Sequence, residues 1–195
     1  NLSQKHVERT LAADRPETLE IEVDQGFQSR GRTIPYFRMW GALLWDTDQQ
    51  PSFTMVTPSG ERVPLTHGQK KTVGPMTIQG QMQTSPRGTH HLIFVVSVNS
   101  RQDQIEPGTW KIEVEEVEET DTLIGRVMDR YSSWGVGIRW KQPTRDRGTM
   151  VFPSTADSAF GVAAYAGRAD QPNDGAGSKV GEFRNYSGRG PRIGG

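Results

Sequence analysis

The chain has 195 residues, enough for one good-sized domain or for a compact domain with an attached segment. Lys and Arg total 23 and Asp and Glu also total 23, so the formal net charge is zero and no global field favours nucleic acid or an anionic membrane surface. Cysteine is absent, which excludes disulfides, thiolate nucleophiles and cysteine-based zinc sites. No apolar run approaches the roughly 20 residues that span a bilayer, so we expect neither a nucleic-acid nor a membrane partner.

Short stretches rich in Val, Ile, Thr, Phe and Trp alternate with turn formers, which favours an all-β fold. In the first stretch Leu19, Ile21 and Val23 alternate with polar residues, as in a half-buried antiparallel strand. The Pro and Gly of Thr57–Gly60 predict a hairpin turn. The spacing predicts a two-sheet sandwich of the jelly-roll type with about eight strands. The expected strands are 18–23, 36–45, 53–57, 62–65, 76–82, 92–98, 110–115, 122–128 and 136–140.

Composition changes after Lys141, where a polar, turn-prone stretch leads into a run of small residues and a Gly-rich tail. We therefore expect three parts. These are an amino-terminal connector (1–17), a jelly-roll-like β-sandwich (18–141) and a distinct carboxy-terminal segment (142–195).

Three motifs follow one another in 149–195. Phe152–Ala156 is a proline-containing turn, Phe160–Tyr165 reads FGVAAY and suits a core strand of small residues, and Phe183–Pro191 reads FRNYSGRGP. Together they resemble the segment of subtilisin-like serine proteases (subtilases) that just precedes the catalytic serine. The third motif departs from that family at Gly188, where a second serine is usual. The resemblance implies that 142–195 is a strip of α/β protease core.

The sandwich resembles the jelly-roll insertion that clostridial spore-germination proteases of this family carry before that strip. The resemblance implies a fragment of a serine endopeptidase in which the sandwich supports the protease core, shaping substrate access or keeping the core rigid. Its partners would be the remainder of the core and, in the parent enzyme, a protein or peptide substrate. A secreted or cell-envelope location is favoured on the same ground.

Subtilases hydrolyse peptides through an Asp, His and Ser triad, and the chain contains neither the family's His-Gly-Thr motif nor its Gly-Thr-Ser-Met-Ala motif. We expect no peptide hydrolysis by the chain alone. The resemblance makes Asn1 a candidate for the asparagine that donates to the oxyanion, unless the family asparagine lies upstream. It makes Phe152–Pro153 a candidate cis peptide. No cofactor is expected, although the parent protease could hold calcium through the carbonyls of Ser154, Ala156 and Ala159.

A free-standing β-sandwich module that binds carbohydrate or protein is the alternative function. Its sugar platform would use exposed tryptophans, whereas buried tryptophans favour the insertion. The candidates are Trp40, Trp45, Trp110, Trp134 and Trp140. A basic cluster near the sandwich end would suit an acidic surface on the protease or a propeptide, or would be a solvated rim. It comprises Arg126, Arg130, Arg139, Lys141, Arg145 and Arg147.

Other candidate sites have simpler explanations. Adjacent His90 and His91 should point to opposite faces of a strand, so they cannot readily share one metal ion. The acidic run Glu113–Glu119 suits a solvated strand face better than a cation site. His6 and His67 lack ligand spacing, and Ser132, Ser133 and Ser187 lack a nucleophile motif.

Overall fold

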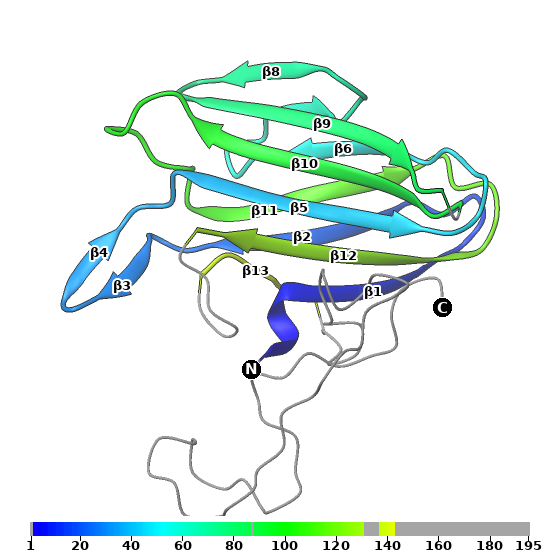
Figure 1. Ribbon diagram of the computed structural model, residues 1–195, viewed down its shortest axis with the longest axis horizontal. Coiled ribbons are helices and arrows are strands. Elements are labelled where there is room, and N and C mark those ends of the chain that lie inside the picture. The colour runs from blue at the N-terminus through cyan, green and yellow to red at the C-terminus, as the bar shows by residue number, and fades with distance from the viewer. Residues whose placement is uncertain (1, 87, 131–136, 143–195) are drawn as a thin grey trace, which may run out of the picture. The chain divides into compact units, whose positions relative to one another are not determined.

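The structure, a computed structural model, describes residues 2–86, 88–130 and 137–142. Two antiparallel sheets form a sandwich, and a small hairpin projects from one end (Figure 1). The six-stranded sheet has the order β1 (His6–Leu11), β12 (Asp121–Asp129), β5 (Arg38–Trp45), β10 (His90–Val98), β9 (Met76–Thr84) and β8 (Lys70–Val73). The five-stranded sheet has the order β13 (Arg139–Trp140), β2 (Glu17–Val23), β11 (Gly108–Glu115), β6 (Ser52–Val56) and β7 (Arg62–Pro64). The projecting hairpin is β3 (Phe27–Ser29) with β4 (Arg32–Ile34), and a 3-10 turn, η1 (Leu2–Lys5), precedes β1.

The expected all-β, two-sheet sandwich is therefore confirmed, while its jelly-roll connectivity stays a prediction. Alternation places the side chains as expected, since Leu19, Ile21 and Val23 of β2 are all at most 1% exposed. The predicted hairpin turn also forms, because the Gly60 amide donates to the Thr57 carbonyl at 2.9 Å between β6 and β7.

Four strands lie outside the ranges expected from the sequence. Strand β1 falls within the expected connector, yet it pairs along its whole length with β12. Only Val7 and Leu11 supply large apolar side chains to the interior, and the residues between them are charged or polar. Edge strand β8 is even more polar, and β3 and β4 span three residues each. These strands form through backbone pairing with a neighbouring strand. Their hydrophobic alternation is too short for the sequence alone to predict them.

The two sheets pack closely where glycine replaces a side chain. A Cβ added at Gly125 of β12 would lie 2.6 Å from Val7 Cγ1 and 2.9 Å from Trp140 Cζ2. Trp140 belongs to the five-stranded sheet, so its indole ring packs onto the backbone of the opposite sheet. A side chain at Gly125 would push this ring out of the core.

Candidate functional site

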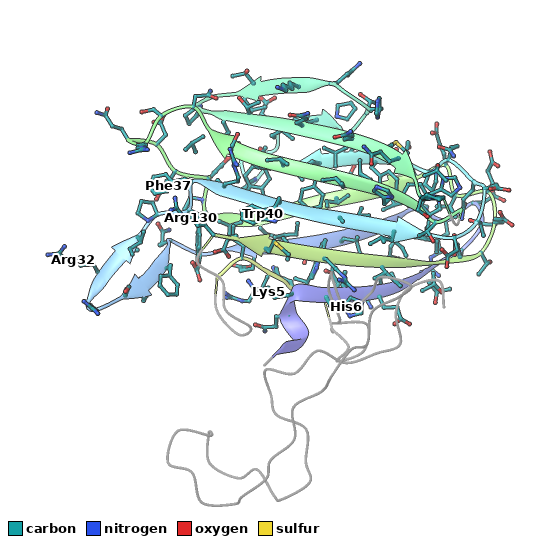
Figure 2. The ribbon with its side chains drawn as sticks, viewed as in Figure 1. Lys5, His6, Arg32, Phe37, Trp40 and Arg130 are labelled. Carbon is teal, nitrogen blue, oxygen red and sulfur yellow. The ribbon has the colours of Figure 1, made fainter. Side chains whose placement is uncertain are left out.

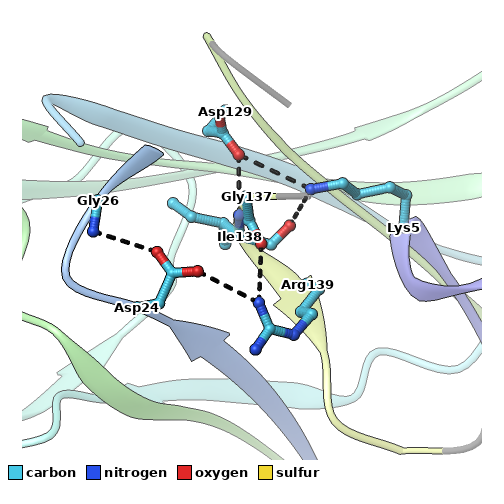
Figure 3. Close-up of polar contacts among 7 residues, drawn as sticks. All are labelled: Lys5, Asp24, Gly26, Asp129, Gly137, Ile138 and Arg139. Atoms are coloured by element: carbon cyan, nitrogen blue, oxygen red, sulfur yellow. Dashed lines mark hydrogen bonds and ion pairs between the residues drawn. The ribbon is translucent and has the colours of Figure 1, made fainter. Parts of the chain in front are cut away.

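One polar cluster joins the two ends of the described sandwich. Lys5 precedes β1 and Ile138 precedes β13, and Lys5 Nζ donates a hydrogen bond to the Ile138 carbonyl although 133 positions separate them (Figure 3). Asp129 Oδ2, at the end of β12, lies 3.7 Å from Lys5 Nζ and accepts the Ile138 amide at 2.9 Å. The Asp129 side chain is fully buried. The carboxylate therefore holds together the start of β1 and the start of β13, the last strand that the structure describes.

A second ion pair extends this cluster to β2. Arg139 Nη1 lies 3.4 Å from Asp24 Oδ2 and donates to the Gly137 carbonyl at 3.4 Å (Figure 3). Asp24 Oδ1 in turn accepts the Gly26 amide at 3.1 Å. We call Lys5, Asp24, Asp129, Ile138 and Arg139 the junction.

Burial perturbs the titrating groups around the junction. Desolvation lowers the pKa of Lys5 to about 8, and the attraction of Asp129 offsets only part of this effect. Desolvation, reinforced by the charge of Asp24, raises the pKa of Tyr36 well above its usual value. Tyr36 also belongs to the lining of the cleft described next.

A cleft of about 410 Å³ opens where β5 begins. Figure 2 shows Phe37, Trp40 and Arg130 gathered at this end, beside the β3–β4 hairpin. Alternation places Arg38 and Trp40 on the outer face of the six-stranded sheet, opposite the buried Met39. The lining residues are Tyr36, Phe37, Arg38, Trp40, Ser97, Val98, Asn99, Ser100, Arg101 and Arg130.

Backbone hydrogen bonds fix the two walls of the cleft. The Val98 amide donates to the Phe37 carbonyl at 3.1 Å, and the Ile105 amide donates to the Tyr36 carbonyl at 2.8 Å. Asn99 is held twice, because its amide donates to the Pro75 carbonyl at 2.9 Å and its Oδ1 accepts the Thr77 hydroxyl at 2.7 Å. These bonds tie Tyr36, Phe37 and Asn99, which lie outside the strands, to neighbouring backbone, whereas Arg101 and Arg130 lie in turns at the ends of strands.

The cleft is strongly basic. Arg38, Arg101 and Arg130 are all exposed, and none of them forms an ion pair with a residue that the structure describes. No Asp or Glu belongs to the described lining. Three guanidinium groups around one hollow favour an anion there.

The basic cluster expected from the sequence divides between two places. Arg139 pairs with Asp24, and Lys141 Nζ lies 3.7 Å from Glu20 Oε2 and 3.9 Å from Glu22 Oε2. Arg130 faces the cleft, and burial lowers the pKa of Arg126. Arg145 and Arg147 lie outside the described residues.

Sequence reasoning missed Arg38 and Arg101 as members of the cleft. They lie more than 60 positions apart along the chain, and no local pattern connects them with Arg130. Of the cleft's residues, the sequence had offered Arg130, as part of the expected basic cluster, and Trp40, as one of five candidate tryptophans.

Three of the five tryptophans are buried: Trp45, Trp110 and Trp140 are at most 2% exposed. Trp40 is partly exposed in the cleft, and Trp134 lies outside the described residues. A multi-tryptophan sugar platform therefore does not form in the part of the chain that the structure describes. The buried rings act as core anchors.

The histidines and the acidic run make structural contacts. His90 stacks on Trp45 with ring centroids 5.6 Å apart, and its Nδ1 lies 2.9 Å from Thr84 Oγ1. Asp48 Oδ1 lies 3.5 Å from His90 Nε2, so carboxylate, imidazole and hydroxyl follow in the order of a triad. The Asp48 side chain is fully exposed, however, and so is poorly suited to orient the ring.

His91, on the opposite face of β10, lies 3.3 Å from Gln83 Oε1 through its Nε2. In the acidic run, Glu113 pairs with Arg62, and Glu115, Glu116, Glu118 and Glu119 are exposed. Among the described residues, no group of three or more His, Asp or Glu side chains is arranged to hold a metal ion. Within the same residues, no helix combines the length and apolarity required to cross a bilayer.

Several candidates lie outside the described residues. They are Asn1, the Phe152–Pro153 peptide bond, the carbonyls of Ser154, Ala156 and Ala159, and the hydroxyls of Ser132, Ser133 and Ser187. The roles expected of Asn1, the Phe152–Pro153 bond and the three carbonyls stay predictions, and so does the expectation that the three serines are not nucleophiles.

Comparison with known proteins relates the fold to part of a solved protease. No family model and no curated protein matches the chain. Among solved structures, it is similar to the CspB protease of Clostridium perfringens, with a TM-score of 0.57 and 16% identity over 82% of this chain. The match covers 31% of that protease, so the chain spans under a third of its length. The lipase BlEst2 of Bacillus licheniformis in its propeptide form gives a TM-score of 0.43 and 12% identity, over 65% of this chain and 22% of the lipase.

Proposed function

We propose that the chain is part of a subtilisin-like serine endopeptidase and that its sandwich is an accessory domain inserted into the protease core. The main support is the order of two features along the chain. A sandwich whose fold is similar to part of a protease comes first, and the three motifs of 149–195 follow it. Because the identity to CspB is 16%, that likeness supports the fold, and the motifs supply the link to subtilases.

The junction supports an insertion. A domain inserted into another chain must begin and end close together, so that the host fold is not forced apart. The bond from Lys5 to the Ile138 carbonyl brings those two points together, and Asp129 clamps both. The protease core would accordingly lie near the edge where β1 and β13 begin, with the sandwich shaping substrate access or stiffening the core.

In the parent enzyme the chemistry would be acyl transfer by a serine nucleophile, with a histidine base oriented by an aspartate. The family motifs for those three residues do not occur in the 195 residues. The chain by itself should therefore leave peptides intact, and a calcium ion, if the parent holds one, would lie in the segment after Thr149.

The test is to read the coding sequence on both sides of the chain and then label the full-length protein with a fluorophosphonate probe. Asp and His motifs upstream, a Gly-Thr-Ser-Met-Ala motif downstream, and labelling that disappears when that serine becomes alanine would support the proposal. Stop codons or unrelated domains on both sides would rule it out.

The second candidate is a β-sandwich module that binds protein or carbohydrate, and the open cleft around Trp40 is the observation that favours it. Unrelated flanking domains together with ligand binding by the isolated chain would select this function.

A further inference from the structure

We infer that the cleft is a binding site for a peptide segment that carries a carboxylate side chain next to apolar residues. The carboxylate would lie among Arg38, Arg101 and Arg130, and an apolar neighbour would lie on Trp40. This inference concerns residues of the chain itself and does not depend on the protease proposal.

The charge of the cleft selects an anion. Guanidinium groups bind carboxylates through paired, charge-assisted hydrogen bonds, and an exposed group without a carboxylate partner keeps that capacity. Elsewhere on the sandwich, Arg62, Arg139 and Lys141 are paired with Glu113, Asp24 and Glu20, respectively. The three cleft arginines each lack an ion pair with any described residue, and they differ from other exposed arginines such as Arg32 in lining one hollow together.

The surface beside the cleft selects a ligand with apolar side chains. Trp40 pairs in register with Val95 of β10 on one side and with Met128 of β12 on the other. Met128 is 40% exposed, and Ile93, two residues from Val95 on the same face, is 37% exposed. An inorganic anion would leave this apolar strip uncovered, whereas an extended peptide would cover it.

The size and rigidity of the cleft suit such a ligand. Its volume of about 410 Å³ falls in the range of small-ligand pockets. Its walls are held by the bonds to the Phe37 and Tyr36 carbonyls, so binding would require little ordering of the backbone.

The experiment uses the full 195-residue chain and the synthetic peptide acetyl-Val-Leu-Glu-Leu-Val-amide, followed by amide and indole NMR shifts during titration. The expected result is saturable shifts at Trp40 and Arg130, with binding weakened about tenfold or more when Gln replaces the peptide Glu. The variants Arg130→Gln and Arg38→Gln should show the same loss.

Arg32→Gln is the matched control, because Arg32 is an exposed arginine of β4 outside the cleft lining (Figure 2). It should bind the Glu peptide as the unmodified chain does. Circular dichroism melting of every variant would separate lost binding from lost folding.

Several results would overturn the inference. These are equal binding of the Glu and Gln peptides, unchanged binding by a folded Arg130→Gln variant, or sulfate alone giving the same affinity and shifts as the peptide. Shifts at Trp40 with a neutral oligosaccharide and none with the peptide would overturn it in favour of a sugar site.

Discussion

Asp129 and Arg130 are neighbours in the sequence, yet they belong to opposite kinds of electrostatic environment. The Asp129 carboxylate is fully buried in the junction, 3.7 Å from the Lys5 ammonium. Arg130 is exposed in the cleft and pairs with no described carboxylate. In the junction charge fixes the geometry of the chain, whereas in the cleft charge remains free to bind a partner.

The first prediction tests the structural side of this comparison. Asp129→Ala removes the acceptor of the Ile138 amide and leaves Lys5 buried without its carboxylate. We expect the free energy of unfolding to fall by about 3–5 kcal/mol, measured by urea denaturation. Asp129→Asn, which keeps a hydrogen-bond acceptor, should lose less. Equal stability of Asp129→Ala and the unmodified chain would contradict the role of the junction.

The second prediction compares two tryptophans, one from each environment. Trp140→Ala should lower the free energy of unfolding by about 3–5 kcal/mol, because the Trp140 ring fills the space above Gly125. The loss of unfolding free energy in Trp40→Ala should be about 3 kcal/mol smaller than the loss in Trp140→Ala, since part of the Trp40 side chain already faces solvent. Thermal melts of both variants, followed by far-ultraviolet circular dichroism, measure the difference. Similar losses for the two variants would show that Trp40 is a core residue.

The third prediction concerns pH. The pKa of Lys5 is about 8 in the folded protein, below its ordinary value of 10.5, so the unfolded state binds more protons between these two pH values. The free energy of unfolding should therefore rise with pH, by about 2 kcal/mol between pH 8 and roughly pH 9.5. Lys5 contributes no pH dependence below about pH 7, where both states are protonated.

The control for this pH dependence is Lys5→Met, which should flatten the rise in urea denaturation midpoints. Above about pH 10 the raised pKa of Tyr36 acts in the opposite direction, because the unfolded state releases the phenolic proton first. A rise of equal slope in Lys5→Met would show that another group causes it.

The fourth prediction has the smallest effect on stability. Arg130→Gln should change the free energy of unfolding by less than about 0.5 kcal/mol, because an exposed side chain without an ion pair contributes little. Denaturation in parallel with Asp129→Ala makes the comparison direct. A loss near that of Asp129→Ala would mean that Arg130 is structural and not free to bind.

Much of the sandwich was predictable from short stretches. Alternation in β2 and β11 and the Thr57–Gly60 turn are local signals, and each element formed close to its expected range. Strand β1 was not predictable for two reasons. It is an edge strand whose polar residues interrupt the hydrophobic alternation, and its pairing partner, β12, lies more than 100 positions away.

The site was less predictable than the fold. The sequence indicated a basic cluster, but in the fold Arg139 pairs with Asp24, just after β2, and Lys141 pairs with Glu20 of β2. Arg130 instead lines the cleft with Arg38 and Arg101. The functional assignment in 149–195 depends on motif order, which needs no tertiary contact, and so it stays a proposal supported by the sequence.

The sequence by itself determined the β class, the Thr57–Gly60 turn and the inward or outward side of the main strands, because a period of two and the chemistry of Pro and Gly are local properties. Only the tertiary structure decided that Lys5 meets the Ile138 carbonyl and that three distant arginines share one cleft. Such meetings depend on how strands from opposite ends of the chain pair, and no local pattern encodes that pairing.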